Sequence, residues 1–138
     1  MKDAMQALNM QAQRQAVDEV DAVFTNNMVL LLEVQESGKL ISNTVGRELI
    51  VGRADNITDY IPEIDMTEHG AYRLGLSRRH AVIQRDGNSL VVKDLNSRNG
   101  TFVNGAIVPG GNTHPIRNGD ELRFGNLVTH VIFEQQAE

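Results

Sequence analysis

Two segments of the sequence carry side chains that can bind an anion. Gly52-Arg53 directly follows an apolar run typical of a β-strand, which places the arginine at the mouth of a loop. A guanidinium there can fork two phosphate oxygens, and the glycine lets the main chain approach closely. Ser77-Arg78-Arg79-His80 precedes a second apolar run and offers a hydroxyl and a main-chain N–H to another oxygen. The two segments predict an anion site built on loops.

The charge around these segments differs from that of the whole chain. The protein has a formal net charge of −5, yet the stretch 73–98 holds six basic and two acidic residues, a net of +4. The residues are Arg73, Arg78, Arg79, Arg85, Lys93 and Arg98 against Asp86 and Asp94. Such a stretch can attract an anion, or it can be a solvated surface balanced by acidic residues elsewhere in the fold.

A third segment centres on Asn99. Asn99-Gly100 and Asn104-Gly105 are turn dipeptides five residues apart, and a short strand fits between them. A hairpin with good turn residues explains this pattern. The carboxamide of Asn99 also has both a donor and an acceptor, so it could pair with the main chain of an extended peptide.

An enzymatic alternative uses the same residue types. Ser77 and His80 could be a nucleophile and its general base, and Asp94 could orient that base. The sequence contains no recognisable nucleophile elbow or oxyanion loop, so we do not expect an enzyme. The absence of cysteine excludes a thiolate nucleophile, a Cys-ligated zinc and a disulfide framework. We expect neither a metal nor a cofactor.

Length and composition limit the classes of partner. The 138 residues, 41% of them apolar, suffice for one packed domain. The net negative charge, with 4% aromatic residues and no Trp, argues against nucleic acid and anionic membranes. No apolar run approaches the roughly 18 residues of a membrane span, and the first ten residues lack the apolar region of a secretory signal. We therefore expect a cytoplasmic monomer.

The pattern of elements changes near residue 26. From there on, short runs of Val, Ile and Leu alternate with turn residues, which predicts an all-β domain of antiparallel strands over 26–138. The predicted strands are 28–34, 48–51, 81–85, 90–93, 121–124 and 128–133. The long connection 54–76 has one short extended candidate at 64–66, and 108–118 is expected to be irregular. Residues 1–25 are predicted to be an arm, an amphipathic helix or partly disordered.

Taken in order on an all-β background, Gly52-Arg53, Ser77-x-x-His80 and Asn99-Gly100 resemble the forkhead-associated (FHA) domain, a phosphothreonine-peptide-binding module. The resemblance extends from about Met28 to Phe133 and includes the late segment 118–125. It implies a β-sandwich of about eleven strands in two twisted, mainly antiparallel sheets, with the ligand held by loops at one end.

The resemblance also implies a role for each site residue. Arg53 and Ser77 would contact the phosphate, Arg78 would add its main-chain N–H or its side chain, and Arg98 would supply a further contact. Asn99 would hold the peptide backbone beside the phosphothreonine.

Three further residues would be structural at the site. Gly52 would allow close approach of the main chain, His80 would brace the loops without touching the ligand, and Gly100 would keep its turn tight. The partner implied is a threonine-phosphorylated protein or peptide, a serine/threonine kinase or its substrate. The chain would then be an adaptor in kinase signalling.

One departure from the family concerns specificity. The 24 positions from Arg53 to Ser77 form a longer connection than in compact members, with 67–73 as the surplus. Tyr72 or Arg73 could select the peptide, or the surplus could pack on the scaffold.

There are two alternatives to the adaptor hypothesis. One is a scaffold of the same fold that binds without phosphate. The other is self-binding through a phosphorylated Thr25, for which binding between two molecules is sterically easier than binding within one.

Overall fold

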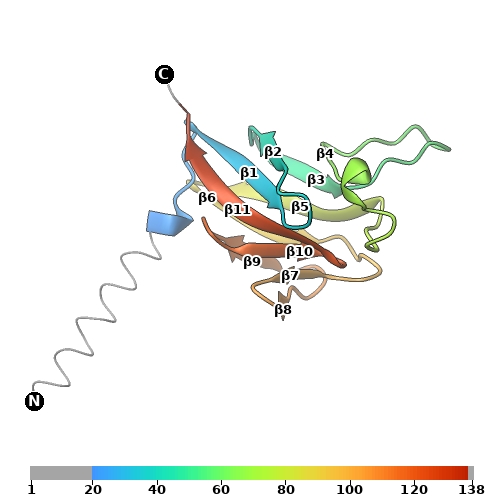
Figure 1. The fold of residues 1–138 in the computed structure, drawn as a ribbon. Coiled ribbons are helices and arrows are strands. Elements are labelled where there is room, and N and C mark those ends of the chain that lie inside the picture. Colours follow the sequence, from blue (N-terminus) through green and yellow to red (C-terminus); the bar gives the residue numbers. More distant parts are fainter. Residues whose placement is uncertain (1–19, 137–138) are drawn as a thin grey trace, which may run out of the picture.

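Two β-sheets form the protein, and the computed structural model describes residues 20–136 (Figure 1). The first sheet has the strand order β2-β1-β11-β10-β7-β8 and the second β4-β3-β5-β6-β9. The first consists of β2 Leu40–Asn43, β1 Met28–Val34, β11 Leu127–Gln135, β10 Glu121–Phe124, β7 Thr101–Val103 and β8 Ala106–Ile107. The second consists of β4 Ile64–Asp65, β3 Glu48–Gly52, β5 Arg79–Asp86, β6 Ser89–Asp94 and β9 Thr113–Ile116, with a 3-10 turn η1 at Thr67–His69. All recorded strand pairs are antiparallel except β3 with β4, which confirms the predicted sandwich.

The core lies between the two sheets. Alternation along β6 buries Leu90 and Val92, and the same alternation along β10 buries Leu122 and Phe124. These side chains belong to one cluster of buried apolar residues contributed by both sheets. Burial of apolar surface stabilises a sandwich at about 25 cal/mol per Å², so the alternating faces fix the register of each strand.

The segment 108–118 is more regular than its sequence suggests. The prediction of an irregular connection is wrong over Thr113–Ile116, because β9 pairs with β6 in register, with Pro115 opposite Val91. Proline cannot donate to a strand ladder, but β9 is the edge strand of its sheet and has a partner on one side only. The buried Ile116 fixes the strand against the core.

The predicted arm is described only in part. Its residues 1–19 lie outside the described residues, and 20–22 are helical. Phe24 is fully buried in the core and packs edge-on against Phe133, with 5.0 Å between ring centroids. A core residue therefore precedes the predicted domain start at residue 26. Among residues 20–136, no helix is long and apolar enough to cross a membrane.

The two ends of the sandwich carry different segments (Figure 1). At one end, residue 136 donates its N–H to the Asn27 carbonyl, close to Thr25 and the start of β1. At the other end the connections β3–β4, β4–β5, β6–β7 and β10–β11 meet. Asn126 of the last turn, for example, donates to the Leu74 carbonyl, and Gly125 donates to the Gly100 carbonyl.

Candidate functional site

Gly52 allows the main chain of β3 to lie very close to the residues before β5. A Cβ built at this position would lie 1.8 Å from the carbonyl oxygen of Arg78, far inside van der Waals contact. The register between β3 and β5 shifts here, and the N–H of Arg53 donates to that same carbonyl at 3.2 Å. Only glycine permits this contact, which places Arg53 directly beside Arg78 and Ser77.

The guanidinium of Arg53 is held by one of its three nitrogens. Nε donates to the Leu76 carbonyl at 2.9 Å, and the Cζ atom lies 5.2 Å from the ring centroid of Tyr72. The two terminal nitrogens make no hydrogen bond with any residue in 20–136. Their planar fork is therefore oriented by the protein and open to a bidentate acceptor such as phosphate.

Ser77 is a neighbour of Arg53, since it lies between Leu76 and Arg78, whose carbonyls both accept hydrogen bonds from Arg53. The Ser77 Oγ atom accepts the N–H of Arg98 at 3.2 Å. The hydroxyl hydrogen remains able to donate, because accepting a bond uses only a lone pair. Arg53, Ser77 and Arg98, far apart in the sequence, thus meet at one end of the sandwich.

His80 is fully buried and engaged on both ring nitrogens. Nδ1 accepts the Ser77 N–H at 3.1 Å, and Nε2 donates to the Gly100 carbonyl at 2.9 Å. Burial lowers the pKa of His80 below its ordinary 6.5, against the opposing effects of the Gly100 hydrogen bond and of Asp94. The ring is neutral in this arrangement and contacts the main chain of Ser77, not its hydroxyl. The geometry gives no support to a Ser77–His80 nucleophile pair.

Asp94 braces the loop between β6 and β7. The carboxylate accepts hydrogen bonds from the N–H and hydroxyl of Ser97 and from the Thr101 hydroxyl, the last at 2.7 Å. Ser97 in turn accepts the Gly100 N–H at 2.9 Å. Asp94 makes no hydrogen bond to His80, so the enzymatic alternative in which Asp94 orients a base is not supported. The Asp-x-x-Ser spacing, which favours a local side-chain turn, is the signal that could have revealed this brace.

Asn99 projects from that braced loop. It is exposed, and its Nδ2 donates to the Gly75 carbonyl at 2.9 Å, while Oδ1 has no partner among the described residues. Gly100 follows with a φ of +87°, a left-handed conformation that favours glycine. The amide is therefore fixed on one side and open as an acceptor on the other.

Two arginines at the site differ in their partners. Arg98 is exposed, and its guanidinium forms no ion pair within the described chain. Arg78 pairs with Asp55, with 2.7 Å between Nη1 and Oδ2. The sequence did not identify Asp55, because it lies 23 residues from Arg78 and carries no motif of its own.

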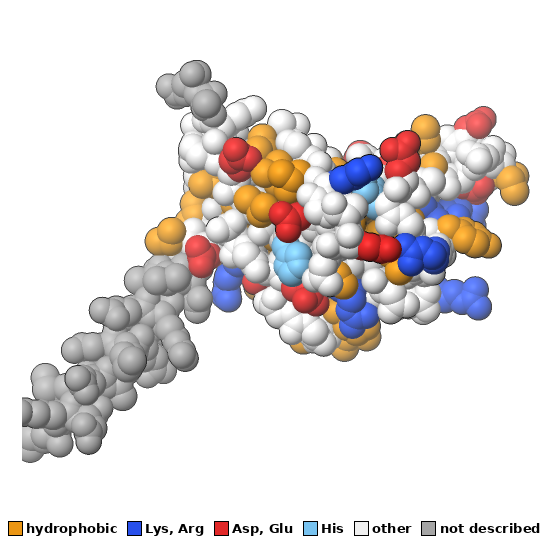
Figure 2. Space-filling view, viewed as in Figure 1, with side chains coloured by type: hydrophobic (Ala, Val, Ile, Leu, Met, Phe, Trp, Pro, Cys, Tyr) orange, Lys and Arg blue, Asp and Glu red, His pale blue; other side chains and the backbone are white. Residues whose placement is uncertain are grey.

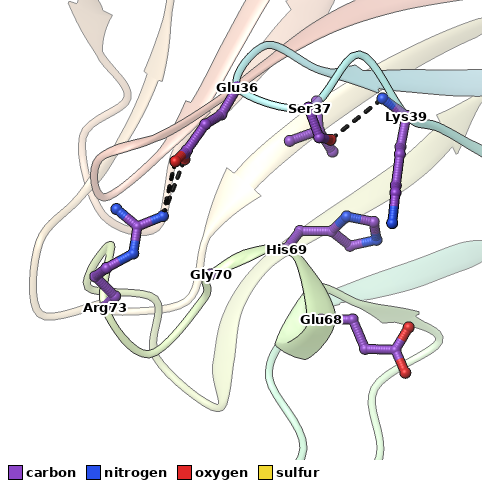
Figure 3. A pocket seen from close by; sticks show the side chains of 8 residues that line it. Glu36, Ser37, Lys39, Glu68, His69, Gly70 and Arg73 are labelled. Atoms are coloured by element: carbon purple, nitrogen blue, oxygen red, sulfur yellow. Dashed lines mark hydrogen bonds and ion pairs between the residues drawn. The ribbon is translucent and has the colours of Figure 1, made fainter.

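The proposed specificity residues point to different neighbours. Arg73 donates to both carboxylate oxygens of Glu36 at 3.0 Å, and Figure 3 shows it turned toward the β1–β2 connection. Tyr72 is 82% exposed and lies beside Arg53. Ala71, between these and the 3-10 turn, is fully buried. The segment 67–73 therefore packs on the scaffold in part and presents Tyr72 to the site.

A hairpin formed by residues 55–60 lies beside these residues. Asp55 and Tyr60 pair through both main-chain hydrogen bonds, and Ile57 at the tip is 94% exposed. Lys and Arg side chains gather at this end of the molecule (Figure 2). Two hollows flank the hairpin. One is lined by Arg53, Ala54, Asp55, Asn56, Ile57, Thr67 and Tyr72, the other by Thr58, Asp59, Tyr60, Ser77, Arg78 and Arg79.

Sequence comparisons connect this geometry to known proteins. Residues 44–125, more than half of the chain, match the FHA domain family. Protein FraH of Nostoc sp. is 34% identical over 72 residues, which cover 51% of this chain and 25% of FraH. The FHA domain-containing protein FhaA of Mycobacterium tuberculosis is 35% identical over 77 residues, which cover 56% of this chain and 12% of FhaA. The chain thus spans a quarter or less of these curated relatives.

Solved structures share the fold. A structure from work on phosphothreonine-dependent FHA domain interactions is 29% identical with a TM-score of 0.58, covering 78% of this chain and 96% of that one. The FhaA FHA domain, in complex with the intracellular domain of Rv3910, is 30% identical with a TM-score of 0.56, covering 75% and 98%. FHA domains are binding modules. With its two-sheet sandwich and its match over residues 44–125, the chain belongs to the FHA domain family.

Proposed function

We propose that this chain binds threonine-phosphorylated proteins or peptides and acts as an adaptor in serine/threonine kinase signalling. The observation that carries the proposal is the Arg53 guanidinium, whose Nε donates to the Leu76 carbonyl next to Ser77, while its two terminal nitrogens bond no residue in 20–136. Phosphothreonine has a charge of about −1.5 to −2 and three acceptor oxygens. A guanidinium fork and a hydroxyl match those acceptors.

The contacts of the remaining site residues suggest a role for each in the proposed binding. The Arg98 guanidinium forms no ion pair with any residue in 20–136, and Arg78 lies next to Ser77 in the chain. Asn99 would accept an N–H of the peptide backbone through Oδ1, since Nδ2 is fixed by Gly75. His80 and Gly100 would hold the two loops together beneath the ligand, and Gly52 would keep Arg53 close to Ser77.

Structures of similar proteins support the proposed class of partner. The FhaA FHA domain has been solved with the intracellular domain of another protein, and an FHA domain has been analysed for phosphothreonine-dependent interactions. We infer that the partner here is a phosphorylated kinase or kinase substrate.

The direct test is fluorescence polarisation with degenerate peptide pools that contain phosphothreonine, phosphoserine or no phosphate. We expect binding to the phosphothreonine pool and loss of binding in Arg53→Ala. Burial of the threonine methyl contributes about 0.8 kcal/mol, a factor of about four over phosphoserine, and orientation can add to it. The control is Arg117→Ala, which removes an exposed arginine next to Asn118, a residue that bonds Asp21 at the terminal end of the sandwich.

Several results would contradict this proposal. Retained affinity in a folded Arg53→Ala protein would refute the site. Equal binding to the unphosphorylated pool, or partner capture that resists phosphatase, would instead indicate the phosphate-independent scaffold. Thr25 lies at the terminal end of the sandwich, opposite the site, so self-binding would join two molecules and would appear as phosphorylation-dependent dimerisation that Thr25→Ala abolishes.

A further inference from the structure

Asp55 holds one of the arginines of the proposed phosphate site. The distance from its Oδ2 to Nη1 of Arg78 is 2.7 Å, the shorter of the two ion pairs recorded for residues 20–136. The side chain of Asp55 is 12% exposed and that of Arg78 is 57% exposed. The acidic partner is therefore set into the protein surface, and a ligand can reach the pair from the arginine side.

Local contacts fix the carboxylate in place. Oδ1 accepts the N–H of Ile57 at 3.0 Å, and Oδ2 also accepts the hydroxyl of Thr58 at 2.9 Å. The main chain of Asp55 is paired with Tyr60 in both directions. The hydrogen bond from Arg78, followed by those from Ile57 and Thr58, lowers the pKa of Asp55 to about 2. The group is thus a fixed anion throughout the neutral pH range.

The ion pair is adjacent to the residues that would bind the phosphate. The carbonyl of Arg78 accepts the N–H of Arg53, and Arg78 directly follows Ser77. Of the two hollows beside the hairpin, one contains Arg53 and Asp55, and the other contains Ser77 and Arg78. The Asp55–Arg78 pair therefore links residues of the two hollows, and a phosphate bound by Arg53 and Ser77 would come within reach of the Arg78 guanidinium that Asp55 now holds.

We propose that Asp55 is an internal competitor for the phosphate: phosphothreonine displaces its carboxylate from Arg78, and the freed guanidinium then binds the phosphate. This inference rests on the proposed function. A partly exposed ion pair contributes little net free energy, whereas a phosphate brings more charge and can accept two bonds from one guanidinium. The exchange therefore favours a phosphate, while a peptide carboxylate would gain almost nothing by replacing a carboxylate that is already in place.

The test compares two variants of the same hairpin. Asp55→Asn removes the charge but keeps an Oδ1 acceptor for the Ile57 N–H, so the hairpin is retained. Asp59→Asn removes an equal charge four residues away, from the same hollow as Ser77 and Arg78, but Asp59 forms no ion pair within residues 20–136. The position is exposed, and asparagine tolerates its φ of +57°. With a labelled phosphothreonine peptide from the enriched pool, we expect Asp55→Asn to bind roughly two- to fivefold more tightly than wild type. Asp59→Asn should change affinity less, and only at low salt.

Arg78→Ala, made in wild type and in the Asp55→Asn protein, distinguishes a competitor role of Asp55 from a positioning role. We expect it to weaken peptide binding more in the Asp55→Asn protein than in wild type, because only there is the guanidinium free before the ligand arrives. Equal or weaker binding by Asp55→Asn would overturn the competitor role and would make Asp55 a residue that positions Arg78. If wild type binds the peptide and loses it with Arg53→Ala, the proposed function stands regardless of that result. If neither wild type nor Asp55→Asn binds any phosphopeptide, the proposed function fails, and the competitor role fails with it.

Discussion

Nε2 of His80 lies 2.9 Å from the carbonyl oxygen of Gly100 and thereby joins the start of β5 to the turn before β7. The other ring nitrogen accepts the N–H of Ser77. A single buried ring therefore fixes the relative position of the serine that faces the proposed phosphate and of the loop that carries Asn99. Because both contacts are to the main chain, they set loop geometry without requiring any particular neighbouring side chain.

The first prediction is a pH-dependent stability that depends on His80. Its pKa in the folded protein is below the ordinary 6.5, mainly because of burial. Between that lower value and 6.5, the unfolded chain binds a proton that the folded protein does not. Stability should therefore be full above pH 6.5 and decline as the pH falls below it. Urea unfolding at several pH values from 7.5 to 5 measures this slope.

Variants test the assignment of the slope to this ring. His80→Ala should lower the free energy of unfolding by about 2–4 kcal/mol, because it leaves a cavity and two main-chain groups without partners. The free energy of unfolding of His80→Ala should also no longer decline below pH 6.5, whereas that of His114→Ala, a variant outside the site, should still decline. An unchanged slope in His80→Ala would disprove the assignment. Unchanged stability with lost peptide binding would instead place His80 at the ligand.

Gly52 provides the second prediction. A side chain here meets the main-chain carbonyl of Arg78, which cannot rotate away, so Gly52→Ala must push β3 from the segment before β5. The expected cost is about 1–3 kcal/mol in the free energy of unfolding. The peptide affinity should fall as well, since the shift moves Arg53 relative to Ser77.

Gly46→Ala is the matched control for that change. Gly46 is exposed, and a Cβ built at this position has no atom within 4 Å. Its φ is not positive, so alanine fits its backbone conformation. Its substitution should stay within about 0.5 kcal/mol of wild type. Denaturant midpoints that move equally for the two variants would show that the contact with Arg78 is unimportant.

Much of the fold could be read from local patterns. The apolar runs correctly predicted β1 at Met28–Val34 and β10 at Glu121–Phe124. Burial alternates from residue to residue along β10, whereas β1 buries three consecutive leucines. The same criterion missed β2, β8 and β9. β2 has no fully buried residue, and β9 combines polar residues with a proline that only an edge strand tolerates.

The details of the site were less predictable, for a physical reason. Arg53 is oriented by the carbonyl of Leu76 and Asn99 by that of Gly75, and every residue has a carbonyl, so no residue type marks such a partner. The Asp55–Arg78 pair likewise depends on how a hairpin is folded against a loop. Residue types indicated which groups could bind an anion, whereas their mutual positions follow from tertiary structure.

The third prediction concerns Asn99. Asn99→Ala removes the open Oδ1 acceptor and the bond to Gly75, so we expect phosphopeptide affinity to fall roughly three- to thirtyfold. The free energy of unfolding should fall by about 1 kcal/mol or less, because the residue is exposed. Asn112→Ala, at an exposed turn, serves as the control in the same polarisation assay. A full-affinity Asn99→Ala protein would argue against a backbone-holding role.

The last prediction separates Tyr72 from Arg73, which are adjacent in the sequence but directed to different neighbours. Tyr72 is exposed beside the Arg53 guanidinium, so Tyr72→Ala should change which residues are enriched around the phosphothreonine and weaken binding about two- to fivefold. Arg73 is paired with Glu36, and both side chains are more than 60% exposed (63% and 62%). Arg73→Ala should therefore cost at most about 1 kcal/mol of stability and leave peptide selection unchanged. Peptide-library selection on the two variants tests this prediction. A changed peptide preference in Arg73→Ala, together with an unchanged one in Tyr72→Ala, would assign peptide selection to Arg73 instead.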